Sequence, residues 1–335
     1  MKAQNLRTAA LLVCSLFAAS LFTATPALVQ AQTTAASWPA RPVTFVIPVA
    51  PGSNTESEPR LYANKMSEAL GKPFVLDFKP GAANVLGSRY VAQSAGDGYT
   101  LLVGNANFPL MQLIVKDAPD PGKAFAPVSL MSKRSTLFVM SNSAPFSGIK
   151  EYIAYGKANP GKINFGVSGL GSTQHLHAVW MHSMMGSEPT YIAYKGVGAM
   201  LPDLMAGRVD VGIASIAASM GQVKAGKIRM LAYGAKERSP AVPDVPTVAE
   251  QGVPEFEYLS WLGIIAPGST PAPLVARIST ELAKAARQPD VIAQLAKEAT
   301  SVVGSTPQEF QRQINSEVER WKALVQKTGF KFEEN

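Results

Sequence analysis

Val43-Thr44-Phe45-Val46-Ile47 is followed by Pro48-Val49-Ala50-Pro51-Gly52-Ser53-Asn54 and then by a helical pattern that ends at Leu70. The β-branched and aromatic residues of the first run predict a buried strand, and the prolines and glycine of the second predict a loop. Thr55-Glu56-Ser57-Glu58 matches a capping box, which predicts the start of a helix. Free backbone N–H groups and the helix dipole favour an anion at such a helix start. The simpler alternative is an ordinary strand-to-helix turn.

A second unit of the same kind lies in the middle of the chain. Ile163-Asn164-Phe165-Gly166-Val167 predicts a strand, Ser168 to Thr173 a loop, and Leu176 to Met184 the apolar face of a helix. Ser172 or Thr173 could cap this helix and also contact a ligand oxygen, although capping alone would explain them equally well. Strand and helix signals alternate elsewhere, so we predict an α/β fold with mostly parallel sheet in two similar lobes.

The first 31 residues have the pattern of a secretory signal peptide. Lys2 and Arg7 flank the start, Ala9 to Phe22 is apolar, and cleavage is expected after Ala31. The apolar run is short for a membrane span, and no later segment is long enough to be one. Cys14, the single cysteine, lies inside this run, so the mature chain has no disulfide. Export without disulfides is typical of a bacterial periplasm.

Charge and motifs exclude several classes of function. The formal charge is +7, but the 31 lysines and arginines form no run, which argues against nucleic acid as a partner. His175, His177 and His182 have no acidic residue at metal-ligand spacing, so we predict no metal site and no cofactor. His175, at the helix start, is a candidate ligand contact, and the helix dipole there favours its neutral form. No Gly-x-Ser-x-Gly elbow is present, which gives no support to a serine hydrolase.

Four aromatic residues come just after predicted strands: Phe108, Tyr194, Tyr233 and Trp261. Ligand pockets are mostly apolar with a few placed polar groups, so these rings could form the apolar part of a pocket. Core packing is the alternative for each of them taken singly.

Short motifs in a fixed order resemble one known family, the periplasmic solute-binding proteins of tripartite tricarboxylate transporters, also called Bug receptors. The matching runs are Trp38-Pro39-Ala40-Arg41-Pro42, Asp97-Gly98-Tyr99-Thr100-Leu101-Leu102, Phe125-Ala126-Pro127-Val128-Ser129, Ala158-Asn159-Pro160-Gly161-Lys162, Gly171-Ser172-Thr173 with His175, Tyr194-Lys195-Gly196, Pro243-Asp244-Val245-Pro246-Thr247 and Trp261 with Gly263. They cover nearly all of the mature chain.

The resemblance implies a two-lobed periplasmic binding protein fold of type II, with the ligand between the lobes and no catalysis. The first lobe would comprise residues 38–140 and 260–335, and the second lobe residues 141–259. The family's ligands are mostly carboxylates, held by the two loops described above. The expected ligand-binding residues are Ala50, Pro51, Gly52, Ser53, Asn54, Thr55, Asn105, Phe108, Gly171, Ser172, Thr173, Gln174, His175, Tyr194, Ala214, Ser215 and Trp261.

Departures from the family pattern bear on the ligand. Phe108 stands where a small or polar residue is usual, and Ala214-Ser215 replaces a common Asp-Asn pair. Gln174 stands where serine is frequent. A pocket that loses an acid and gains a phenyl ring favours a carboxylate with an aromatic or bulky apolar body over citrate or aspartate.

The sequence therefore predicts a monomeric periplasmic receptor that delivers an organic carboxylate to the membrane subunits of a transporter. One alternative is a sensor that reports the same ligand to a membrane signalling partner. A second alternative is an exported hydrolase, for which Ser172 would be the nucleophile to test.

Overall fold

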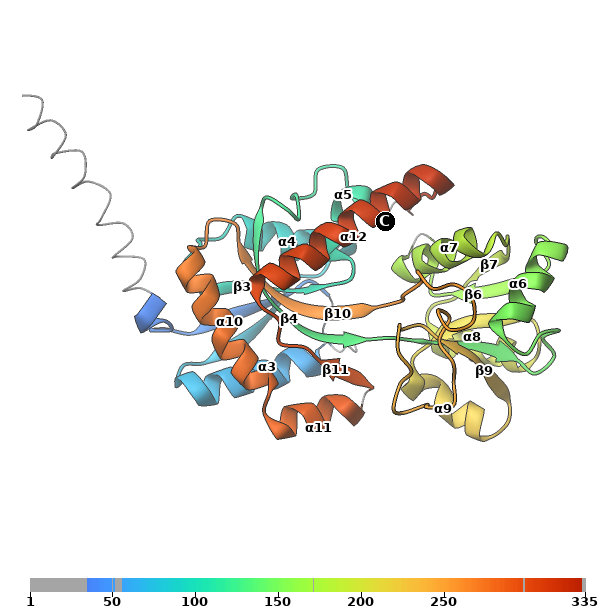
Figure 1. Ribbon diagram of the computed structural model, residues 1–335. Coiled ribbons are helices and arrows are strands. Elements are labelled where there is room, and N and C mark those ends of the chain that lie inside the picture. The colour runs from blue at the N-terminus through green and yellow to red at the C-terminus, as the bar shows by residue number, and fades with distance from the viewer. Residues whose placement is uncertain (1–34, 50, 52–55, 171, 298, 333–335) are drawn as a thin grey trace, which may run out of the picture.

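The computed structural model describes residues 35–49, 51, 56–170, 172–297 and 299–332. They form two mixed sheets, each flanked by helices and placed side by side along the molecule (Figure 1). We call lobe 1 the residues around the first sheet and lobe 2 residues 137–259, which surround the second sheet. The predicted two-lobed α/β architecture is confirmed, but the prediction of mostly parallel sheets is wrong, because each sheet contains both parallel and antiparallel pairs.

Lobe 1 is built on a six-stranded sheet of order β11-β4-β10-β3-β1-β2. Its strands are β1 (Val43–Ile47), β2 (Phe74–Phe78), β3 (Thr100–Asn105), β4 (Phe125–Arg134), β10 (Ser260–Pro267) and β11 (Thr300–Val302). Its helices are α3 (Ser57–Leu70), α4 (Val85–Ala92), α5 (Met111–Ile114), α10 (Ala272–Ala286), α11 (Pro289–Lys297) and α12 (Pro307–Thr328), with 3-10 turns η1 (Ala82–Asn84) and η2 (Phe108–Leu110). β1 is buried at every position except Thr44, as its run of apolar residues predicts.

Lobe 2 is built on a five-stranded sheet of order β7-β6-β8-β5-β9. Its strands are β5 (Leu137–Ser141), β6 (Asn164–Val167), β7 (Thr190–Ala193), β8 (Val211–Ala214) and β9 (Ile228–Tyr233). Its helices are α6 (Ile149–Ala158), α7 (Thr173–Met185), α8 (Val197–Met205) and α9 (Ile216–Lys224). Each lobe has its own core: Phe45 and Ile264 belong to a cluster in lobe 1, and Phe138 and Phe165 to one in lobe 2.

The chain crosses between the lobes twice. The first crossing is short, because β4 ends at Arg134 in the first sheet and β5 begins at Leu137 in the second. The second crossing precedes β10, which begins at Ser260. Residues 137–140, which the sequence assigns to the first lobe, therefore pair in the second sheet. The strands on both sides of the crossing, β4 and β5, are apolar, so the sequence does not indicate which sheet each strand joins.

Strand register directs one end of each sheet toward the junction between the lobes. In lobe 1 the last residue of β3, Asn105, lies opposite Leu262, near the start of β10. In lobe 2 the last residue of β8, Ala214, lies opposite Leu137, the first residue of β5. Because β1 is parallel to β3 and β6 is parallel to β8, the carboxyl ends of these four strands all lie at the junction. This is the edge at which open α/β sheets bind ligands.

A run of three non-glycine residues in lobe 1 has the left-handed backbone conformation. φ is 46° at Ala82, 49° at Ala83 and 81° at Asn84. The run connects β2 to α4, beside the carboxyl end of β3. Asparagine tolerates this region through its short polar side chain, whereas alanine is strained by about 1–2 kcal/mol.

We expect Ala83→Gly to raise the free energy of unfolding by about 0.5–1 kcal/mol, because relief of strain exceeds the entropy that glycine adds to the unfolded chain. Urea denaturation would measure the change. Ala154→Gly, at an exposed position within α6, is the matched control and should lower stability by about 0.5–1 kcal/mol. Equal losses in both variants would show that Ala83 is not strained.

Candidate functional site

The lobe 2 side of the junction is organised around the N-terminus of α7. Ser172 caps the helix: its Oγ accepts a hydrogen bond from the backbone N–H of His175 at 3.2 Å and donates one to the carbonyl of Gly169 at 2.8 Å. A hydroxyl has a single hydrogen, so this arrangement leaves Ser172 no hydrogen to donate to a ligand. The capping interpretation of Ser172 is therefore confirmed, and a hydroxyl held in this way gives no support to a serine nucleophile.

Thr173 and Gln174 supply the free donors of the helix start. The first backbone hydrogen bond within the helix is from Leu176 N–H to the carbonyl of Ser172, at 2.9 Å. The backbone N–H groups of Thr173 and Gln174 therefore lie ahead of the intrahelical ladder and point out of the helix end. Within the part of the chain that the structure describes, the hydroxyl of Thr173 has no hydrogen-bond partner. Three donors thus lie together at a helix N-terminus, where the dipole favours an anion.

The side chain of Gln174 ties this helix start to two strands. Its Oε1 accepts a hydrogen bond from the backbone N–H of Ser168, just after β6, at 2.6 Å. Its Nε2 makes a long contact of 3.5 Å with the carbonyl of Ile213 in β8. Gln174 therefore fixes the α7 N-terminus against the strand ends at the junction. The sequence predicts Gln174 as a ligand-binding residue, but in this structure its side chain forms hydrogen bonds with backbone groups of the protein.

The neighbouring strand ends of lobe 2 carry three further predicted residues. Tyr194 follows β7, and its hydroxyl donates a 2.7 Å hydrogen bond to Asp203 in α8. Burial of the phenol, supported by the Asp203 carboxylate, raises the Tyr194 pKa to about 12, so the hydroxyl stays protonated at neutral pH. Ser215 is exposed and caps α9 through Ala218 N–H. Ala214 is buried, with its carbonyl bonded by the hydroxyl of Thr136 in the first crossing.

His175 stands two residues after the start of α7. Its ring lies 4.4 Å from that of Tyr191 and 5.0 Å from that of Phe330 in the C-terminal segment, edge to face. Burial lowers the His175 pKa to about 4, so the imidazole is neutral at pH 7. The sequence also predicts a neutral His175, but it attributes the lowered pKa to the helix dipole, whereas the structure shows burial as the cause.

The lobe 1 side presents an asparagine pair at the end of β3. Asn84 Nδ2 donates to Asn105 Oδ1 at 3.0 Å, and the same oxygen accepts the backbone N–H of Asn107 at 3.0 Å. Asn105 is half-buried at the junction and agrees with the sequence prediction in position. Asn84 is absent from the predicted set. Its one signal is an asparagine shortly after a proline–glycine turn, which is common in turns of no functional importance.

Two of the predicted pocket aromatics lie in the core of lobe 1. Phe108 is 2% exposed and packs edge to face on Phe125 at 4.9 Å. Trp261 is also 2% exposed, packs on Phe310, and donates from Nε1 to Glu317 of α12 at 3.1 Å. This packing gives no support to the assignment of the two rings to a ligand pocket, which stays a prediction. η2 turns Phe108 inward, and irregular register along β10 sets the direction of Trp261.

The first predicted loop is described only in part. Ala50, Gly52, Ser53, Asn54, Thr55 and Gly171 lie outside the described residues, and Pro51 is exposed after β1. α3 begins at Ser57, with Glu56 as N-cap and no side-chain capping bond. Glu58, the expected second member of a capping box, is 1% exposed and accepts a 3.1 Å hydrogen bond from Arg134 at the end of β4. The N-terminus of α3 is therefore a second helix start in lobe 1, and it follows β1 along the chain.

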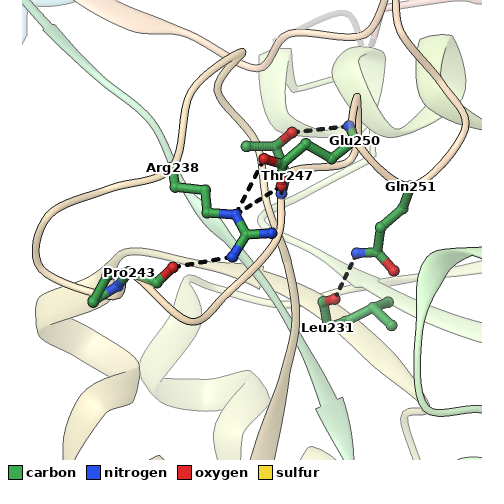
Figure 2. Close-up of polar contacts among 6 residues, drawn as sticks. All are labelled: Leu231, Arg238, Pro243, Thr247, Glu250 and Gln251. Carbon is green, nitrogen blue, oxygen red and sulfur yellow. Dashed lines mark hydrogen bonds and ion pairs between the residues drawn. The ribbon is translucent and has the colours of Figure 1, made fainter.

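A hollow of about 670 Å³ is lined by β11 of lobe 1 and by the segment after β9 in lobe 2. Its lining residues belong to other elements than β1, β3, β6 and β8, whose ends are described above. Figure 2 shows its Arg238 bound to Glu250 at 2.9 and 3.1 Å and to the carbonyl of Pro243 at 3.3 Å. Lys133 and Glu257 also line it, so both signs of charge are present. A carboxylate is favoured by the free N–H groups at a helix N-terminus, and the size of a hollow gives no such preference. We therefore place the candidate site at the junction.

The described residues contain no group of three or more side chains suited to hold a metal ion. Among those same residues, no helix is both long and apolar enough to cross a bilayer.

Comparison with known proteins identifies the family. A family model described as "Tripartite tricarboxylate transporter family receptor" matches residues 59–330. Protein BugT of Bordetella pertussis is 31% identical over 306 residues, which cover 90% of this chain and 94% of BugT. The solved structure titled "R. palustris Rpa4515 with adipate" is 34% identical and covers 88% of this chain and all of that chain, with a TM-score of 0.72. MatC (Rpa3494) from Rhodopseudomonas palustris with bound malate is 31% identical, with 86% of this chain and all of that chain covered and a TM-score of 0.68.

Proposed function

The chain belongs to the tripartite tricarboxylate transporter receptor family, a family of solute-binding receptors, and on that basis we propose that it captures an organic carboxylate at the junction of its lobes. One observation carries this proposal: the N-terminus of α7 presents the backbone N–H groups of Thr173 and Gln174 and the hydroxyl of Thr173 at that junction. A carboxylate accepts several hydrogen bonds at once, and it matches a helix N-terminus in charge as well as geometry.

The strength of such a site agrees with a transport receptor. A hydrogen bond to a charged group contributes about 1.5–3 kcal/mol, so three or four of them supply the roughly 8 kcal/mol of a micromolar affinity. The N-terminus of α3 would supply the remaining donors from lobe 1 when the lobes close. Contacts made in both lobes favour the closed form, which is how a ligand shifts the balance between open and closed forms.

We base the class of carboxylate on two relatives, Rpa4515 with adipate and MatC with bound malate. Adipate and malate are both dicarboxylates, and this chain has two helices, α3 and α7, that start after strands whose carboxyl ends lie at the junction. The sequence predicts an aromatic acid from Phe108 and Ala214, but both residues are buried. We therefore propose an aliphatic dicarboxylate as the ligand.

We further propose that the receptor is exported by its N-terminal signal peptide and acts in the periplasm as a monomer. Its partners would be the membrane subunits of a tripartite tricarboxylate-type transporter. The basic, apolar and small-residue order of the first 31 residues supports export. The family model supports the transporter.

Calorimetry against adipate, malate, citrate, terephthalate and the neutral adipamide tests the proposal. We expect a dicarboxylate to bind and adipamide not to bind, because the helix starts recognise charge. At a hundredfold excess over Kd the bound acid should add about 2.7 kcal/mol to the free energy of unfolding. Failure of every acid, or equal binding of adipamide, would overturn the proposal.

We expect Thr173→Ala to weaken dicarboxylate binding by about 1 kcal/mol, or roughly fivefold in Kd, because one donor is lost. Stability should change little, since Ser172 still caps α7. Thr280→Ala, at an exposed position in α10, is the control and should leave Kd unchanged. Equal affinities of wild type and Thr173→Ala would remove this hydroxyl from the site.

A further inference from the structure

The C-terminal helix α12 belongs to lobe 1, but its second half lies against α7 of lobe 2 (Figure 1). Trp321 and Leu324 of α12 form one buried cluster with Leu110 of lobe 1 and Leu176 of α7. The two crossings of the chain are therefore not the only connection between the lobes. This further connection is made by side chains.

Trp321 is the centre of this contact. Its side chain is 1% exposed, and its ring lies 4.6 Å from that of His177 and 5.5 Å from that of Trp180, edge to face in both cases. The guanidinium of Arg320 lies over the rings of Trp180 and Trp321, at 4.6 and 4.8 Å from their centres. Among the described residues, Nε1 of Trp321 has no hydrogen-bond partner. The packing of the ring, and not its N–H group, thus makes the contact.

His177 transmits the contact to the candidate site. Its imidazole is 3% exposed and lies between Trp321 and the ring of Tyr258, which is 4.2 Å away. Nδ1 of His177 donates a hydrogen bond of 2.8 Å to the carbonyl of Thr173. Two residues earlier, Phe330 of the C-terminal segment packs on His175. The first two turns of α7 therefore rest on residues that come from lobe 1.

We propose that Trp321 is a positioning residue for ligand binding, which acts through His177 on the backbone of Thr173. The ring of Trp321 fixes His177, and His177 holds the carbonyl of Thr173 so that the free N–H groups of the α7 N-terminus keep their direction. Lobe 1 thereby sets the orientation of the anion-binding helix end in lobe 2. The proposal rests on the proposed function for its effect on affinity, but its structural half can be tested without any ligand.

Trp321→Leu is the test variant, and Phe310→Leu is its matched control. Phe310 is also a buried aromatic residue of α12, but it packs on Trp261 within lobe 1. Trp321→Phe keeps an aromatic ring, although a smaller one, and the N–H group that it loses has no partner among the described residues. It should therefore fold normally and retain most of the contact, which keeps the test open if Trp321→Leu unfolds.

Amide hydrogen exchange of the ligand-free proteins tests whether Trp321 orders the N-terminus of α7. We expect residues 175–177, whose N–H groups are hydrogen-bonded, to exchange about tenfold faster in Trp321→Leu than in the wild type, with no such change in Phe310→Leu. Calorimetry with adipate and malate tests the effect on binding, where we expect Kd to rise about tenfold in Trp321→Leu and to recover in Trp321→Phe. Unchanged exchange at residues 175–177, or faster exchange with unchanged Kd, would overturn the proposal. If neither acid binds the wild type, the proposed function fails for these ligands, and the exchange result alone decides whether Trp321 orders the helix end.

Discussion

Acidification from pH 7 to pH 5 is expected to lower the free energy of unfolding by about 4 kcal/mol through His177 and His182 alone. Both imidazoles are buried in lobe 2, and burial lowers the pKa of each to about 3. The unfolded chain takes up protons below about pH 6.5, whereas the folded protein does not until about pH 3. Stability is thus complete above pH 6.5 and is lost as the pH falls, by about 2 kcal/mol per histidine at pH 5.

The surroundings of the two rings explain why they resist protonation. His182 lies between two tyrosine hydroxyls, with Nε2 at 2.6 Å from Tyr152 and Nδ1 at 2.8 Å from Tyr191. Neutral imidazole donates at one nitrogen and accepts at the other, so it suits one hydroxyl as donor and one as acceptor. A second ring proton would turn the accepting nitrogen into a donor and break that match. At His177 the guanidinium of Arg320 adds to the effect of burial.

Urea denaturation at pH 7, 6 and 5 measures this effect. The slope of the unfolding free energy against pH gives the number of protons taken up on unfolding. Burial raises the pKa of Glu317 and Asp210, and these two groups act in the opposite direction, so the total is best resolved with a variant. His182→Gln should reduce the slope by one proton, or about 1.36 kcal/mol per pH unit, between pH 5 and 6. His177→Gln should do the same. A slope that is identical in all three proteins would show that neither histidine titrates differently on folding.

Local patterns in the sequence predict both strand–loop–helix units correctly. Apolar periodicity and turn residues act over a few positions, so β1 with α3 and β6 with α7 are readable without the fold. The helix start at Ser172 to His175 follows from the same local signals. This helix start lies at the junction because the carboxyl ends of parallel strands lie at the same edge of a sheet.

Side-chain direction after a strand is not readable in the same way. Phe108 lies in a 3-10 turn and Trp261 near irregular register in β10, and either feature can reverse the face that a ring occupies. The contact of Trp321 with His177 is also hidden, because it joins positions far apart in the chain. Asn84 has a left-handed conformation that depends on its bond to Asn105 as well as on its neighbours.

Gln174→Glu is expected to weaken dicarboxylate binding by about 1–4 kcal/mol, roughly fivefold to several hundredfold in Kd. Two unit charges 4 Å apart repel by about 1 kcal/mol in water and by about 4 kcal/mol at an effective dielectric constant near 20. The new carboxylate loses the long 3.5 Å contact with the Ile213 carbonyl, but it can still accept the hydrogen bond from Ser168 N–H, and it lies at a helix N-terminus, where negative charge is favourable. Stability should therefore hold while affinity falls.

This separation of affinity from stability makes Gln174→Glu the sharpest test of the α7 N-terminus. Gln294→Glu makes the same chemical change at an exposed position in α11 and should leave Kd unaltered. Calorimetry with adipate and malate, together with urea denaturation of each variant, measures both quantities. If Gln174→Glu binds a dicarboxylate as tightly as Gln294→Glu does, the ligand's charge does not lie at the start of α7. The anion would then have to be held by lobe 1 alone, where α3 begins.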